Sequence, residues 1–82
     1  MRKVLGRYIV MDTEICHGEL TFRGTRIFVR DVLDQLADGM AWESIVDSWG
    51  GSVKKAAIAE ALRLAREALI DHKHCLAAET PD

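Results

Sequence analysis

Apolar and polar positions follow two different periods along the chain, and the change falls near residue 30. Residues 7–11 (RYIVM) are mostly β-branched or aromatic and predict a short strand. Residues 20–22 (LTF) alternate between the two faces of a second strand, and after Gly24 the segment 25–29 (TRIFV) predicts a return to extended structure. The N-terminal third is therefore expected to form two or three short strands.

The spacing of apolar residues changes to three and four at about Arg30, which predicts a helix. Its apolar positions are Val29, Val32, Leu33, Leu36, Ala37 and Met40. Gly39 falls near the expected end of this helix and is predicted to be the C′ residue, where a positive φ is needed.

A second helix is predicted over residues 41–49 (AWESIVDSW), ending at Gly50–Gly51. Trp42 and Trp49 are seven positions apart and hence share one face of that helix. We interpret them as core or dimer-interface residues rather than as stacking platforms for bases. Ser52 follows the glycines and occupies the expected N-cap position of a third helix.

The third helix is predicted from about Val53 to His72 and is the longest. Its core stripe is expected to consist of Ile58, Ala61, Leu62, Ala65 and Leu69. The Gly-Gly-Ser turn before it has the length found in helix-turn-helix units, which makes the third helix the candidate recognition helix. The predicted fold class is mainly α, a three-helix, helix-turn-helix-like bundle preceded by two or three short strands.

The chain has 82 residues, of which 49% are hydrophobic and 29% charged. This length indicates a single domain, residues 1–82, with a core over about residues 8–71 and a frayed tail at 73–82. Its apolar surplus favours a homodimer. No segment resembles a signal peptide or a membrane span, and the two cysteines are expected to be reduced, so we expect a soluble cytoplasmic protein.

Charge is distributed unevenly along the chain. The net charge is −2, which by itself gives no support to nucleic-acid binding. However, residues 1–30 hold six basic and three acidic side chains, whereas residues 31–53 hold five acidic and no basic ones. Such asymmetry is compatible with two partners of opposite charge, and ordinary surface scatter is the alternative.

The start of the third helix carries the sharpest local signal. Lys54 and Lys55 lie where cations oppose the helix dipole, and Ser52 has no acidic partner three positions later, so no capping box forms. A phosphate could bind the free amides and both ammonium groups. We therefore predict Ser52, Lys54 and Lys55 as DNA-phosphate contacts. The alternative is a pair of solvated lysines.

A second basic cluster consists of Arg23, Arg26 and Arg30. Arg26 or Arg30 is the predicted flanking phosphate contact. The alternative is intramolecular pairing with Asp31 and Asp34, which we favour for at least one of the three arginines.

Cysteine and histidine occur together in two segments and were considered as a metal site: Cys16, His17, His72, His74 and Cys75. Neither segment has the spacing of a zinc motif. No orienting residue, oxyanion motif or phosphate-binding glycine loop accompanies them. We expect no metal, no cofactor and no enzymatic activity.

Several motifs resemble the domain of unknown function 433 family. A glycine-containing strand leads into Gly24-Thr25-Arg26-Ile27-Phe28-Val29, which matches the family's G-T-R-I-x-V element. The helix 32–39 matches its I-L-x-x-L-x-x-G pattern, Glu43-Ser44-Ile45 its E-x-I helix, and residues 58–62 its alanine-rich helix start. The resemblance covers about residues 8–71.

The resemblance implies a helix-turn-helix-like bundle that is usually dimeric and acts as a type II antitoxin. Such a protein pairs with a toxin, often a PIN-like ribonuclease, and represses its own operon by binding operator DNA. Two alternatives remain open at this point: a stand-alone DNA-binding regulator, and a dimeric protein-interaction module that binds no DNA. No membrane partner is expected.

Overall fold

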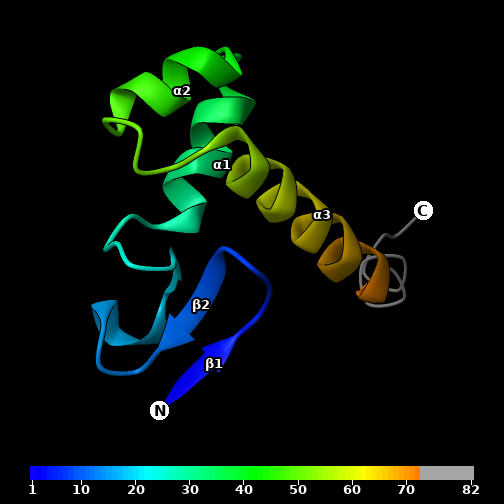
Figure 1. Cartoon of the computed structure of the whole chain (residues 1–82). Coiled ribbons are helices and arrows are strands. Elements are labelled where there is room, and N and C mark those ends of the chain that lie inside the picture. Colours follow the sequence, from blue (N-terminus) through cyan, green and yellow to red (C-terminus); the bar gives the residue numbers. More distant parts are fainter. Residues whose placement is uncertain (73–82) are drawn as a thin grey trace, which may run out of the picture.

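The computed structural model describes residues 1–72. Its elements follow in the order β1 (Arg2–Val4), β2 (Ile9–Asp12), a 3-10 turn (Cys16–Gly18), β3 (Leu20–Phe22), α1 (Val29–Ala37), α2 (Trp42–Ser48) and α3 (Lys55–Asp71) (Figure 1). The protein is mainly helical, with three short N-terminal strands, and the predicted fold class is confirmed.

The strands form one antiparallel sheet in the order β1-β2-β3. The extended structure predicted at residues 25–29 is confirmed only in part, since Phe28 is extended and forms an isolated bridge with Thr21, but no strand continues there and Val29 already begins α1. Side-chain bonding explains the difference: the Thr25 hydroxyl donates to the Phe22 carbonyl at 2.7 Å and accepts from the Ile27 N–H at 3.0 Å. These bonds hold a turn against the end of β3, where a longer strand would otherwise continue.

The third strand lies instead at the N-terminus. β1 pairs with β2 through Val4 opposite Val10, and the Leu5 N–H continues the hairpin by donating to the Ile9 carbonyl at 2.9 Å. The predicted strand over residues 7–11 therefore begins two residues late, at Ile9, because Arg7 and Tyr8 form the hairpin turn.

One hydrophobic core joins the sheet to all three helices. Its buried residues are Ile9, Phe22, Val29, Val32, Ile45, Val53, Ala57, Ile58 and Ala61. Trp42 and Trp49 are half-buried against this cluster, which confirms that they are packing residues. The Trp49 indole N–H donates to Gln35 Oε1 at 2.8 Å, so its one polar atom is satisfied.

The predicted end of α1 is confirmed and the predicted start of α3 is not. Gly39 follows the C-cap Asp38 with φ +86°, as a C′ residue does. In contrast, the N-cap of α3 is Lys54 and not Ser52. Val53 and Ile58 are both 0% exposed and belong to one cluster, in the positions of a hydrophobic staple about an N-cap at 54.

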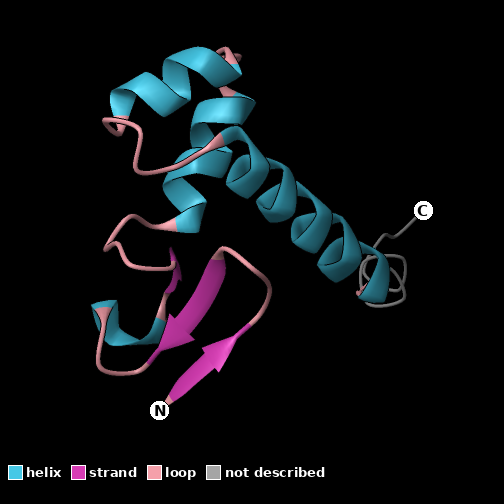
Figure 2. Ribbon diagram, viewed as in Figure 1, coloured by secondary structure: helices cyan, strands magenta, loops and turns pink. Residues whose placement is uncertain are grey.

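The predicted core stripe of α3 is correct only in its first half. Ile58 and Ala61 are buried, whereas Leu62, Ala65 and Leu69 are exposed. Figure 2 shows the reason: α3 runs on past α1 and α2, so its last turns extend beyond the other helices. The apolar face of these turns is not covered by residues 1–72.

Candidate nucleic-acid interface at the start of α3

A hollow of about 210 Å³ lies at the start of α3. Three parts of the chain contribute its lining, namely the residue before β2, the end of β3 with the next residue, and the turn leading into α3 with the first helical turn. The lining residues are Tyr8, Phe22, Arg23, Ser52, Lys54 and Ala57. Two of the six, Arg23 and Lys54, are cationic.

Backbone contacts hold these walls in place. The Arg23 N–H donates to the Tyr8 carbonyl at 2.7 Å, which fixes the residue after β3 beside the hairpin turn. The Tyr8 N–H in turn donates to Glu60 Oε1 on α3 at 2.8 Å. The position of Arg23 is therefore coupled through two hydrogen bonds to the helix that provides the opposite wall.

The first turn of α3 has no intrinsic cap. No side chain bonds the first-turn amides, and no acidic residue lies in that turn. The predicted Ser52 cap is absent because Ser52 stands two residues before the N-cap. Free N–H groups and the positive end of the helix dipole make such a terminus attractive to an anion.

The two predicted lysines differ in their surroundings. Lys55 Nζ lies 3.0 Å from Glu43 Oε2 of α2 and forms an ion pair with it. The pKa of Glu43 is lowered, first by a hydrogen bond from the backbone and then by Lys55. Within residues 1–72, neither Lys54 nor Arg23 has an acidic group within ion-pair distance. Lys54 and Arg23 are thus the more available cations.

The two flanking arginines of the sequence prediction lie elsewhere. Arg26 lines a separate hollow of about 550 Å³, together with Arg2, Asp12 and Thr25. Arg30 is placed with its guanidinium carbon 4.5 Å from the centre of the Phe28 ring and 3.9 Å from Glu19 Oε2. Its nearby acid is Glu19, not Asp31 or Asp34.

The structure therefore brings Ser52 and Lys54 together with Arg23, which was recognised only as a member of the basic cluster. The sequence signal for Arg23 is its position directly after β3. Its placement beside α3 depends on tertiary packing, which the sequence pattern does not show. The predicted contacts Arg26 and Arg30 do not line this hollow.

The structure describes three of the five cysteine and histidine residues considered as metal ligands, namely Cys16, His17 and His72. Among residues 1–72, no three His, Cys, Asp or Glu side chains are grouped closely enough to bind a metal ion. Cys16 and His17 lie in the 3-10 turn, and His74 and Cys75 fall outside the described residues, as does the predicted frayed tail. Each helix of the described chain is too short or too polar to span a bilayer.

The family of the protein follows from a comparison with known families. The family described as "Protein of unknown function (DUF433)" matches residues 9–65. The protein belongs to the DUF433 family. In this DUF433 chain the matched region runs from the start of β2 into the middle of α3 and includes Arg23, Ser52 and Lys54. No curated protein and no solved structure matches the chain.

Proposed function

We propose that this protein is the antitoxin of a type II toxin–antitoxin system, a cytoplasmic homodimer that represses its own operon and neutralises a PIN-like ribonuclease. The DNA-binding part of this proposal rests on the start of α3. There, Lys54 and Arg23 flank a hollow that opens beside an uncapped helix terminus following a helix-turn-helix-length connection.

A DNA phosphate fits this arrangement chemically. It would accept hydrogen bonds from the free amides of α3 and pair with the ammonium of Lys54 and the guanidinium of Arg23. Such contacts place the helix on the duplex and carry little sequence information. Arg63 is the first long cationic side chain further along α3 and lies two turns in, so base discrimination by one protomer should be modest.

The DNA-binding part is tested by fluorescence anisotropy on the DNA upstream of the gene across a salt series. Lys54→Ala and Arg23→Ala should each weaken binding and reduce the slope of log K against log salt by about 0.9. Lys3→Ala removes an equal charge from β1 and should leave the slope unchanged. Equal slopes for all four proteins would exclude the start of α3 as the DNA contact.

The toxin-binding part is supported by the charge of α1 and α2. Asp34 and Asp47 are exposed on these helices, and so is Asp38 at the C-cap of α1. Together with Glu43, which pairs with Lys55, they offer a surface for a basic region of a toxin. The test is expression of the neighbouring open reading frame. Alone it should arrest growth, and co-expression with this protein should restore growth and give a co-purified complex.

A DNA-binding regulator without a toxin is the first alternative. It is the correct one if the protein binds its promoter and the product of the neighbouring gene is harmless.

A protein-interaction module that binds no DNA is the second alternative. It is favoured by the net charge of −2 and by the five acids without a base at residues 31–53. If the wild-type protein binds no promoter DNA at any salt concentration but still forms a stable complex with a partner protein, this second alternative is the correct one.

A further inference from the structure

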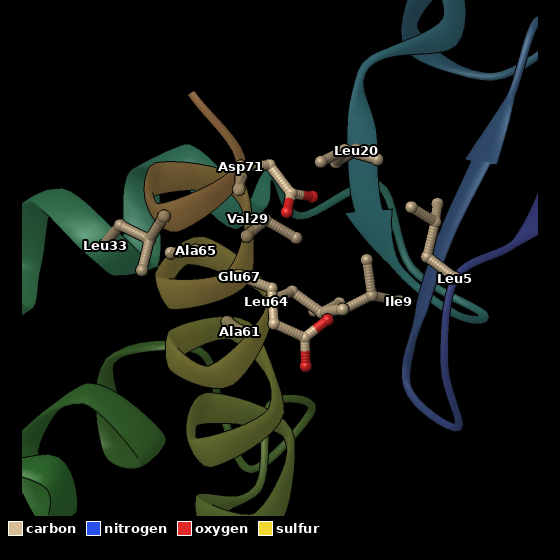
Figure 3. Close-up of a pocket in the computed structure, with 11 residues that line it drawn as sticks. Leu5, Ile9, Leu20, Val29, Leu33, Ala61, Leu64, Ala65, Glu67 and Asp71 are labelled. Atoms are coloured by element: carbon tan, nitrogen blue, oxygen red, sulfur yellow. The ribbon is translucent and has the colours of Figure 1, made fainter. Parts of the chain in front are cut away.

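The two faces of the sheet have different surroundings. Ile9 and Leu20 point toward α3 and line an apolar cleft between the sheet and that helix (Figure 3). Because side chains alternate along a strand, the register partners Val10 and Thr21 lie on the opposite face. Both line the hollow of about 550 Å³ that also contains Arg26. This hollow shares no residue with the apolar cleft or with the hollow at the start of α3.

One buried polar group opens into this hollow. Thr21 is 1% exposed, and its hydroxyl forms no hydrogen bond with any of residues 1–72. Within the same residues, no side-chain nitrogen or oxygen is both sealed from solvent and without a hydrogen bond. The unpaired hydroxyl must therefore reach the accessible surface, and the hollow is the space that Thr21 lines. A buried hydroxyl is costly to leave unpaired, so this position favours a ligand that accepts its hydrogen bond.

Two arginines from distant parts of the chain line the same hollow. Arg2 lies in β1 and Arg26 in the turn after β3, and both are exposed. Within residues 1–72, neither has an acidic group within ion-pair distance. Asp12 also lines the hollow, and its Oδ1 accepts the Glu14 N–H at 2.9 Å. Two cations and one anion give the hollow a net charge of +1, which favours a ligand with a single negative charge.

Hydrogen bonds of the backbone hold the walls of the hollow in place. The Thr13 N–H donates to the Met1 carbonyl at 2.9 Å, which fixes the strand beside Arg2. The two bonds of the Thr25 hydroxyl, to residues 22 and 27, fix the turn on both sides of Arg26. Because these segments are held before any ligand binds, binding has a lower entropic cost.

The remaining walls of the hollow are apolar. Val10 is 4% exposed and Ile15 is half-buried, and both line the hollow. A guanidinium matches the two oxygens of a carboxylate, which can also accept a hydrogen bond from the Thr21 hydroxyl. A short hydrocarbon chain on that carboxylate would contact Val10 and Ile15. A phosphate has no such chain and would bring a second negative charge close to Asp12.

We propose that this hollow binds a small organic carboxylate that carries a short apolar chain. Arg2 and Arg26 pair with the carboxylate, Thr21 donates a hydrogen bond to it, and the apolar walls contact the chain. The proposal goes beyond the DNA and toxin contacts of the proposed function and does not depend on them.

Titration of the isotope-labelled full chain with sodium butyrate, followed by two-dimensional NMR at constant ionic strength, tests the proposal. The amide signals of Val10, Thr21 and Arg26 should shift and saturate with a dissociation constant of about 1 mM, as expected for so small a ligand. Acetate, which lacks the longer chain, should bind more weakly. Absence of saturation with butyrate, or tighter binding of inorganic phosphate than of butyrate, would overturn the proposal.

Two variants and a matched control distinguish the site from an effect of overall charge. Arg26→Met and Thr21→Val should each raise the butyrate dissociation constant about tenfold. Lys3→Met removes one positive charge from the opposite face of β1 and should leave the dissociation constant unchanged. Equal weakening by Lys3→Met would show that butyrate responds only to net charge, and the proposed site would then be wrong.

The stability of Thr21→Val provides an independent measurement. Without butyrate, this variant should resist urea at least as well as the wild type, because it removes a buried hydroxyl that has no partner. A clear loss of stability would show that the hydroxyl is already used within the fold, which contradicts the proposed role of Thr21.

Discussion

Glu60 fastens the β1–β2 hairpin to α3, and its removal has a calculable effect. Its carboxylate accepts the Arg7 N–H at 2.9 Å and the Tyr8 N–H at 2.8 Å. A Cβ added at Gly6 would lie 2.5 Å from Glu60 Oε1, so the carboxylate occupies the space that glycine leaves. Gly6 does not have a positive φ, and its role is therefore room for Glu60 rather than backbone freedom.

Two charge-assisted hydrogen bonds are lost in Glu60→Ala. The exposed Arg7 N–H regains water, whereas the half-buried Tyr8 N–H regains less, so we expect a loss of about 2 kcal/mol in unfolding free energy. Gly6→Ala should displace the same carboxylate and produce a loss of about the same size. Because the two changes remove one interaction, the double variant should also lose about 2 kcal/mol, a coupling of about 2 kcal/mol.

Urea unfolding of the four proteins, followed by circular dichroism, measures this cycle. Each single variant should also melt about 10 °C lower, given the size of the domain. Glu60→Gln keeps the shape and one acceptor oxygen and should fall between the wild type and Glu60→Ala. In the Glu60→Ala background, Gly6→Ala should be neutral or slightly stabilising. Additive losses, within about 0.5 kcal/mol, would refute the steric and hydrogen-bond argument.

Three further outcomes follow from the structure. In an NMR titration the pKa of Glu43 should lie below 4.5 and rise only partly in Lys55→Met, because the backbone hydrogen bond is the larger cause. The ion pair between Lys55 and Glu43 should therefore stabilise the fold at pH values above 4.5, the ordinary pKa of glutamate. Its effect should be lost as the pH falls through the lowered pKa of Glu43. Val53→Ala should lower the unfolding free energy by about 2 kcal/mol in urea, since Val53 is fully buried. Metal analysis of the purified protein should find no zinc, and stoichiometric zinc that is lost in Cys75→Ser would contradict this.

Local signals were enough to predict the three helices. The three- and four-residue spacing around Val32 and Leu36 is complete within α1, and Gly39 ends that helix through its own backbone conformation. Such features depend on neighbours in the sequence, so the sequence alone contains the information needed to predict them.

The errors arose where distant residues decide the structure. β1 is exposed along its whole length and has no apolar alternation, so only its pairing with β2 makes it a strand. Cap preference favours Ser52, but packing of Val53 near Ile58 places the N-cap at Lys54. In α3 the periodicity identified an apolar face without showing which part of it the rest of the chain covers.

The candidate site could be predicted only in part, because some of its contacts join residues that are distant in the sequence. Lys54 and Lys55 are adjacent in sequence, but the Glu43 carboxylate that pairs with Lys55 comes from the preceding helix. Arg23 reaches the site through the turn after β3. The acidic helix α2 therefore affects the start of α3, because the carboxylate of Glu43 neutralises part of the positive charge at the proposed DNA contact. Accordingly, Glu43→Gln should tighten DNA binding in the anisotropy assay.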